Sequence, residues 1–165
     1  METNKIEFEY IKTPLHRYTF SVKPIKEWVE RNSKGKVLNL FAGKTKLKLD
    51  EFRVDIDKTM IADIYMDSYD FVKQCKDKFD TIILDPPYAY RKSMEMYNGN
   101  KASKFNQVKD LIPNILNKDG IVITFGYHSV SMGNSRGFIQ KKILLMSHGG
   151  AIHDTIVTIE KKVKK

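Results

Sequence analysis

Residues 37–43 read VLNLFAG, an apolar run that ends in the small residues Ala42 and Gly43. An apolar run of this length without polar alternation is typical of a strand that is buried on both faces. The small residues after it indicate a tight turn, and a glycine there lets the backbone approach a ligand closely. The sequence therefore predicts the first strand of a parallel sheet at 37–41.

Strand-like and helix-like segments alternate along the rest of the chain. Further strand-like runs occupy 51–56, 62–66, 80–84, 121–125, 141–146 and 154–160. Between several of them, apolar residues at helical spacing predict helices over 23–32, 68–76 and 105–117. This alternation predicts an α/β fold, with a mostly parallel sheet of seven strands and helices on both of its faces.

Two connections depart from the alternation. Only SHGGAIH at 147–153 joins the last two strands, which predicts an antiparallel hairpin at the C-terminal end of the sheet rather than a helical crossover. The stretch 43–51 is too short for a full crossover helix, so we expect either a single helical turn or an extended loop there.

Size and composition restrict what the chain can be. Its 165 residues, of which 41% are hydrophobic and 30% charged, predict one domain over 1–165 without a separate target-recognition domain. The single cysteine, Cys75, excludes an internal disulfide and a cysteine-rich zinc site, and it fits a reducing cytoplasm. No apolar run reaches the roughly 18 to 20 residues of a membrane span, and the N-terminus lacks the apolar core of a signal peptide. We therefore expect a cytoplasmic protein that does not cross a membrane.

The chain is strongly basic. Lysine and arginine number 29 against 20 acidic residues, which gives a formal charge of +9. This balance favours a polyanionic partner such as nucleic acid. A solvated surface that is merely rich in lysine gives the same balance, so charge alone does not decide between these interpretations.

Candidate ligand-binding residues follow the predicted strands directly. In an open parallel sheet, ligands bind beyond the carboxyl ends of the strands. At those positions stand Phe41, Gly43, Asp55, Asp57 and Asp67. A carboxylate after the second strand can accept hydrogen bonds from both hydroxyls of a ribose, so the order of these residues predicts a ligand that contains a nucleoside.

The motif Asp85-Pro86-Pro87-Tyr88 follows the apolar run at 80–84 and indicates the chemistry. Its two prolines fix two φ angles and remove two amide donors, which holds Asp85 extended and leaves local carbonyls as acceptors. An exocyclic amino group that donates both hydrogens to Asp85 and a nearby carbonyl would have its lone pair localised for attack on a methyl group. Tyr88 would stack on a base taken out of the nucleic-acid double helix.

With these motifs the chain resembles the class I S-adenosylmethionine-dependent amino-methyltransferases, and its DPPY form is most similar to the N6-adenine DNA methyltransferases. The resemblance covers nearly the whole chain, because NLFAG at 39–43 matches the family's first motif and 141–160 matches its closing hairpin. It implies the Rossmann-like class I methyltransferase fold and S-adenosyl-L-methionine as cofactor. It also implies a set of catalytic residues, namely Asp85, Pro86, Pro87 and Tyr88.

The resemblance implies cofactor contacts as well, from Phe41, Gly43, Asp55, Asp57, Asp67, His16 and Arg17. The first two would line the cofactor pocket. Asp55, with Asp57 as second choice, would bind the ribose, and Asp67 would bind the adenine ring. His16 or Arg17, ahead of the first strand, would meet the carboxylate of the cofactor's methionine end.

Nucleic-acid contacts are expected from loops. The segment 89–104 interleaves aromatic and basic side chains, which could stack bases and neutralise phosphates, although an ordinary solvated loop has the same composition. The segment 126–138 is expected at the same rim. The candidate residues are Tyr90, Arg91, Lys92, Lys101, Lys104 and Arg136. No metal-ligand cluster stands out, and no metal is expected.

The favoured function is methylation of adenine N6 in DNA. The first alternative is methylation of adenine N6 or guanine N2 in RNA, because family members that act on ribosomal RNA carry similar motifs and also lack a separate recognition domain. The second alternative is a non-catalytic nucleic-acid-binding subunit of a methyltransferase complex. Cytosine N4 and protein glutamine fit less well, since those enzymes more often have Ser or Asn at position 85. Target choice is expected to come from loops, a protein partner or a dimer.

Overall fold

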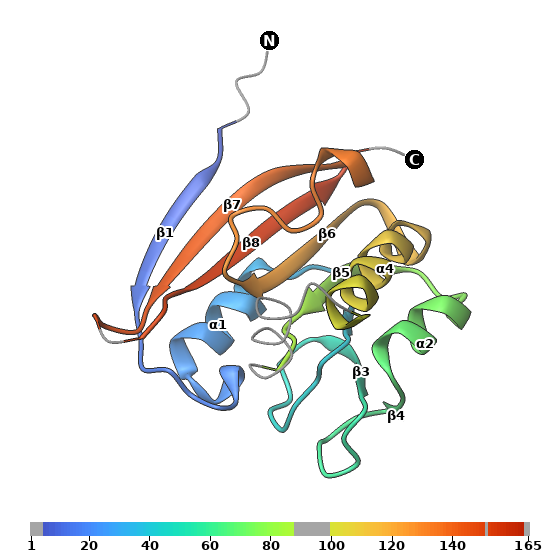
Figure 1. The fold of residues 1–165 in the computed structure, drawn as a ribbon, viewed down its shortest axis with the longest axis horizontal. Helices are drawn as coiled ribbons and strands as arrows, with labels where there is room; N and C mark the ends of the chain where they lie inside the picture. Colours follow the sequence, from blue (N-terminus) through green and yellow to red (C-terminus); the bar gives the residue numbers. More distant parts are fainter. Residues whose placement is uncertain (1–4, 88–99, 151, 164–165) are drawn as a thin grey trace.

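The computed structural model contains one mixed β-sheet with helices against both of its faces (Figure 1). It describes residues 5–87, 100–150 and 152–163. The sheet has eight strands in the order β1-β7-β8-β6-β5-β2-β3-β4, and among them only β8 runs antiparallel to its neighbours. The strands are β1 Glu7–Lys12, β2 Lys36–Asn39, β3 Asp50–Asp55, β4 Ile64–Tyr65, β5 Phe79–Leu84, β6 Leu116–Gly126, β7 Phe138–Ser147 and β8 Thr155–Lys162.

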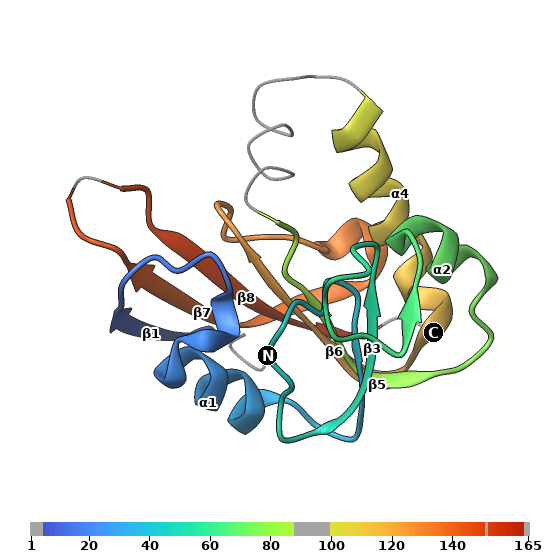
Figure 2. The same cartoon turned by 90° about the horizontal axis from the view of Figure 1, so that it is seen from below.

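Helices cover the two faces of the sheet, with α1 on one side and α4 on the other (Figure 2). The helices are η1 Thr19–Ser21, α1 Lys23–Asn32, α2 Ser68–Gln74, α4 Asn100–Ile115 and η2 Asn134–Arg136. Successive strand residues face opposite sides, so Ile83 packs in a buried cluster with Trp28 of α1, while Ile82 packs with Ile112 of α4. In the described part of the chain, every helix is too short or too polar for a membrane crossing.

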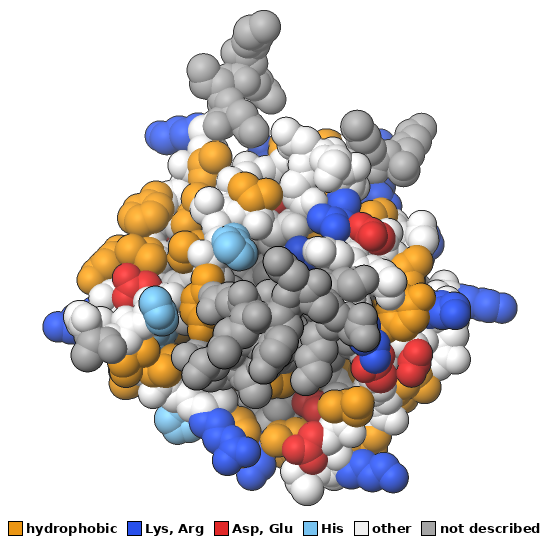
Figure 3. All heavy atoms as spheres, viewed as in Figure 1, with side chains coloured by type: hydrophobic (Ala, Val, Ile, Leu, Met, Phe, Trp, Pro, Cys, Tyr) orange, Lys and Arg blue, Asp and Glu red, His pale blue; other side chains and the backbone are white. Residues whose placement is uncertain are grey.

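All seven predicted strands are present, but the sheet has an eighth, so the predicted strand count is wrong by one. The additional strand, β1, pairs in parallel with β7 at the edge of the sheet. Its sequence EFEYIK alternates apolar and charged residues instead of forming an apolar run, and the side chains of Phe8 and Tyr10 are 64% and 58% exposed. Apolar side chains accordingly gather over this end of the sheet (Figure 3).

Short connections join several strands of the sheet. The predicted antiparallel hairpin between β7 and β8 is confirmed, and the segment between β2 and β3 is an extended loop rather than a helical turn. The connection from β6 to β7 contains only η2. It is held against the sheet by the buried carboxylate of Glu160, which accepts hydrogen bonds from the N–H groups of Ser131, Met132 and Gly133 at 3.1, 2.8 and 2.9 Å.

A side-chain network also attaches the edge strand β1. The carboxylate of Glu9 accepts hydrogen bonds from Trp28 Nε1 at 2.8 Å and from Lys142 Nζ at 2.9 Å. The hydrogen bond from Lys142 is the main reason that the pKa of Glu9 is lowered, while partial burial opposes the shift. Because the pKa is lower in the folded protein, the stabilisation is present above the ordinary Glu pKa of about 4.3 and is lost as the pH falls through the lowered value.

We expect acid to release β1 and to change the fluorescence of Trp28, the only tryptophan of the chain. In a fluorescence titration from neutral to acidic pH, Glu9→Gln should remove this change because its amide does not titrate. The matched control is Glu7→Gln, since Glu7 lies 3.1 Å from the same Lys142 amine but does not bond to Trp28. An unaltered acid-induced change in the Glu9 variant would show that this network does not cause it.

Candidate active site

The carboxyl ends of β2, β3 and β5 meet at one edge of the sheet. The N–H of Leu40 donates to the carbonyl of Ile83 at 3.3 Å, and the N–H of Ala42 donates to that of Val54 at 3.0 Å. The segment after β2 therefore runs between the ends of β5 and β3. The predicted site residues that the structure brings to this edge are Phe41, Gly43, Asp55, Asp57 and Asp85.

Gly43 and Asp55 lie at the centre of this edge. Gly43 has a φ of +67°, a left-handed conformation that glycine adopts without strain. Its N–H donates to Oδ2 of Asp55 at 2.9 Å, and the N–H of Asp57 donates to Oδ1 at 2.9 Å. Each carboxylate oxygen has room for a further donor, because it carries two lone pairs. A Cβ at Gly43 would meet no atom of the described residues within 4 Å, so with respect to them the backbone there faces open space.

The extended loop after β2 is held by Arg53 of β3, whose side chain is buried. Its guanidinium donates to the carbonyls of Ala42, Gly43 and Thr45 at 2.8, 3.0 and 2.9 Å. It also donates to the carbonyl of Ile61 in the neighbouring loop at 2.7 Å. Arg53 was not among the residues predicted from the sequence. An arginine between the apolar residues Phe52 and Val54 of a predicted strand, followed by a carboxylate two residues later, is the signal that could have identified it.

Asp57 differs from Asp55 in its surroundings. Its exposed carboxylate accepts hydrogen bonds from the hydroxyl and the N–H of Thr59 at 2.7 and 2.8 Å. These bonds lower the pKa of Asp57 below its ordinary value, and the bond from the hydroxyl has the largest effect. Asp57 thus stabilises the turn that follows β3, and Asp55 is the carboxylate of the two that contacts Gly43.

Asp67 caps α2. Its Oδ1 accepts hydrogen bonds from the N–H groups of Tyr69 and Asp70 at 2.9 and 3.3 Å, the arrangement of a helix N-cap. Its Oδ2 accepts a hydrogen bond from Lys104 Nζ of α4 at 2.8 Å. Both oxygens therefore have protein partners, and an adenine ring at this position would share Asp67 with the helix and with Lys104.

The segment between β1 and η1 lies beside the loop after β2. Lys44 of that loop places its Nζ 5.1 Å from the ring centre of Tyr18, and the guanidinium of Arg17 lies 5.5 Å from the same ring. The exposed ring of His16 accepts a hydrogen bond from the N–H of Tyr18 at 3.0 Å. The structure thus brings His16 and Arg17 to the edge that contains Gly43.

The DPPY motif begins directly after β5. Asp85 is half-buried, Pro86 is buried and Pro87 is exposed. The rest of the motif and most of the following loop lie outside the described residues, as do the side chains of residues 100–103 in α4. The predictions that this leaves without structural detail are those for Tyr88, Tyr90, Arg91, Lys92 and Lys101.

Arg136 does not lie at the rim that contains Asp85. The prediction that the segment 126–138 lies at this rim is therefore wrong for Arg136. It belongs to η2, directly before β7, and β7 runs in the same direction as β6 because both pair antiparallel with β8. The start of β7 is therefore at the opposite edge of the sheet. There the guanidinium of Arg136 donates to Asp110 Oδ1 at 2.7 Å and to the carbonyl of Met132 at 3.1 Å.

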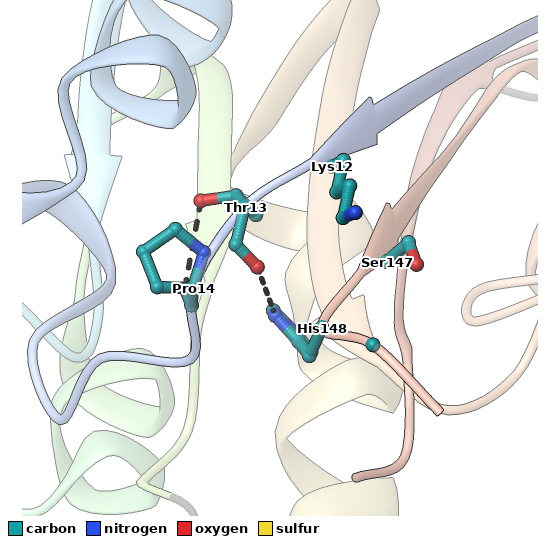
Figure 4. Close-up of a pocket in the computed structure, with 6 residues that line it drawn as sticks. Lys12, Thr13, Pro14, Ser147 and His148 are labelled. Carbon is teal, nitrogen blue, oxygen red and sulfur yellow. Dashed lines mark hydrogen bonds between the residues drawn. The ribbon is translucent and has the colours of Figure 1, made fainter. Parts of the chain in front are cut away.

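A cavity of about 240 Å³ lies at the carboxyl ends of β1 and β7 (Figure 4). It is lined by Lys12, Thr13, Pro14, Ser147, His148 and Gly149. The two ring nitrogens of His148 lie 3.0 Å from the carbonyl oxygen of Thr13 and 2.8 Å from the hydroxyl of Thr155. Because both nitrogens are engaged, His148 connects three strands of the sheet rather than offering a free ring to a ligand.

The overall arrangement is similar to solved methyltransferase structures. N-methyltransferase NodS from Bradyrhizobium japonicum, in complex with S-adenosyl-L-homocysteine, has a TM-score of 0.57 at 10% identity, with 82% of each chain covered. TrmN from Thermus thermophilus has a TM-score of 0.59 at 15% identity, with 86% of this chain and 49% of that chain covered. A provisionally assigned rRNA methylase from Clostridium thermocellum has a TM-score of 0.53 at 11% identity, with 89% and 99% covered.

These likenesses show a methyltransferase-like α/β fold with a mixed sheet. At identities this low, the fold is what they show. No protein-family model and no curated protein sequence matches the chain. Its chemistry must therefore be argued from the residues of the site.

Proposed function

We propose that the chain binds S-adenosyl-L-methionine at the edge formed by Gly43 and Asp55. The observation that carries this proposal is their pairing. A glycine whose backbone is open with respect to the described residues is hydrogen-bonded to a carboxylate that can still accept hydrogen bonds from the hydroxyls of a ribose. Phe41 flanks the glycine, and its ring lies 6.4 Å from that of Phe105 in α4. Arg17, beside the same loop, suits the carboxylate of the methionine end.

The cofactor would supply a methyl group on a positively charged sulfur, and the task of the chain is to align an acceptor nitrogen with it. Asp85 accepts one hydrogen of an exocyclic amino group, and a carbonyl of the adjacent proline turn accepts the other. The nitrogen lone pair, otherwise drawn into the base, then becomes available for attack. The nitrogen would gain the methyl group as the bond between the methyl carbon and the sulfur breaks, with its electron pair left on the sulfur, and it would lose one proton to Asp85 or to solvent. Pro86 restricts the backbone of Asp85, which keeps the acceptors in place.

The acceptor that we favour is adenine N6 in DNA. The DPPY sequence supports an amino group, and the formal charge of +9 supports a polyanionic substrate. On the face seen in Figure 3, the lysine and arginine side chains of the described residues lie at several separate places instead of forming one patch, which suits long-range attraction more than sequence reading. We therefore propose that a protein partner or a dimer contributes target specificity.

RNA is the alternative substrate, with adenine N6 or guanine N2 as the acceptor. The observation that favours it is the likeness to the provisionally assigned rRNA methylase, of which 99% is covered by this chain. This chain thus spans nearly the whole length of a solved chain with that description.

Ligand binding tests the cofactor proposal directly. Calorimetric titrations with S-adenosylhomocysteine, NAD and ATP compare three ligands that all carry an adenosine ribose. We expect saturable binding of S-adenosylhomocysteine and much weaker binding of the other two. Tighter binding of NAD or ATP than of S-adenosylhomocysteine would overturn the proposal, since a carboxylate at the end of β3 suits any nucleoside. Nucleic-acid binding without any of the three ligands would favour a non-catalytic subunit.

A further inference from the structure

We infer that Arg53 is a positioning residue for cofactor binding and takes over the role of the helix that normally follows the first strand of such a site. The inference rests on the proposed function, because it names the residue that orders the proposed cofactor loop. The established features of the fold do not call for an arginine here. Its role follows from the contacts of its guanidinium.

The loop after β2 has no helix to hold its backbone in place. In a common βαβ unit, a helix begins directly after the glycine turn, bonds the carbonyls of its first turn internally and presents free N–H groups to the ligand. No helix is present between β2 and β3, so the carbonyls of this segment have no intrahelical partners. Partly buried carbonyls without partners would be costly, and another donor has to satisfy them.

All three side-chain nitrogens of Arg53 donate hydrogen bonds, and two of them donate to this loop. Nη2 donates to Ala42 and Gly43, Nη1 to Thr45 and to the carboxylate of Glu51, and Nε to Ile61. A guanidinium carries five N–H groups, so each of them has one acceptor. A lysine has only three donors on a single nitrogen and cannot reproduce this pattern.

The same contacts join the two loops that flank Asp55. The carbonyl of Gly43 accepts a hydrogen bond from Arg53 at 3.0 Å and a second one from the N–H of Ile61 at 3.1 Å. The loop after β3 is thereby fastened to the loop after β2. Since the N–H of Gly43 is bonded to Asp55, fixing this glycine also fixes the orientation of the carboxylate.

The orientation of the carbonyls decides which way the amides point. In a trans peptide, the C=O and the following N–H point in opposite directions. The carbonyls of Gly43 and Thr45 turn toward Arg53, so the N–H groups of Lys44 and Lys46 turn away from it. Within the part of the chain that the structure describes, neither of these N–H groups has an acceptor. They are the donors that an anionic ligand group would use here in place of a helix N-terminus.

The charge of Arg53 is neutralised locally. Among the described residues, Glu51 provides the carboxylate that pairs with the guanidinium, and the side chains of both residues are 4% exposed. Removing one member alone would leave a buried charge and could unfold the protein. Arg53→Lys keeps the charge opposite Glu51 and removes the forked donors. The double variant Arg53→Gln with Glu51→Gln removes both charges. It replaces Arg53→Lys in the test if the lysine variant does not fold.

The test measures S-adenosylhomocysteine affinity by calorimetry and, without ligand, hydrogen exchange of segments 40–47 and 57–62. In Arg53→Lys we expect the Kd to rise at least about tenfold and both segments to exchange faster, since several hydrogen bonds of the loop are lost. When the cofactor concentration is varied, KM for the cofactor should rise, while kcat, the rate at saturating cofactor, stays within about twofold.

Lys162→Met is the matched control. Lys162 also holds two backbone carbonyls, those of Pro113 and Leu116, at 2.8 Å each, and it lies at the opposite edge of the sheet. We expect this variant to lose thermal stability without a change in Kd. An unchanged Kd in folded Arg53→Lys, with wild-type protein that binds, overturns the role of Arg53 and leaves the proposed function standing. Wild-type protein that does not bind the ligand overturns the proposed function itself.

Discussion

Replacement of Asp85 by alanine is expected to lower the rate of methyl transfer by about 10²- to 10³-fold, with little change in affinity for S-adenosylhomocysteine. The half-buried carboxylate follows β5 directly, behind the fully buried Leu84, so the strand fixes its position. It both holds the amino group and stabilises the positive charge that develops on the nitrogen. Single-turnover transfer of labelled methyl measures the rate, and calorimetry measures the affinity.

The matched variant is Asp85→Asn. Its amide oxygen can still accept one hydrogen of the amino group, but it carries no charge and offers no base for the proton. We therefore expect an activity between those of the wild type and Asp85→Ala. Wild-type rates in a folded Asp85→Ala protein would mean that this carboxylate does not position the acceptor.

Replacement of Gly43 by alanine is expected to have the largest effect on cofactor binding. The left-handed φ of +67° costs an alanine about 1 to 2 kcal/mol of stability. The added Cβ meets no atom within 4 Å in the described part of the chain, so there it brings strain but no clash. A ligand that approaches this backbone would meet the Cβ, and we expect its affinity to fall at least about tenfold. Thermal unfolding and calorimetry separate the two effects.

The chain offers a matched control for this substitution in Gly149→Ala. Gly149, in the hairpin between β7 and β8, has a φ of +90°, and a Cβ there also meets no atom of a described residue within 4 Å. The strain should therefore be similar, while the proposed cofactor edge is untouched. If both alanine variants bind S-adenosylhomocysteine equally well, Gly43 does not contact the cofactor.

Local sequence patterns were sufficient to predict most of the fold. The apolar run at 37–41 became the buried strand β2, the helix over 23–32 is present with the same bounds, and the short connection at 147–153 joins an antiparallel pair. These features depend on residues that are close in sequence. β1 was not predicted, because its alternating, exposed side chains become a strand only through pairing with β7, about 130 residues later in the chain.

The candidate site was predictable at residues that lie at the ends of predicted strands or directly after them. Gly43 and Asp55 were predicted separately, and the structure joins them in one hydrogen bond. Arg53 was not predicted, because its role depends on carbonyls that reach it from two different loops. Arg136 was misplaced, because its position depends on the direction of β7, which in turn depends on how the antiparallel strand β8 is inserted into the sheet.

Methyl transfer itself tests the proposed function most directly. Labelled S-adenosylmethionine is incubated in parallel with unmethylated genomic DNA, total RNA and protein, and the labelled nucleosides are identified by mass spectrometry. We predict N6-methyladenine in DNA, while methylated adenine or guanine in RNA alone would establish the alternative substrate. Absence of label in every nucleic acid, from a protein preparation that binds S-adenosylhomocysteine, would contradict a base methyltransferase.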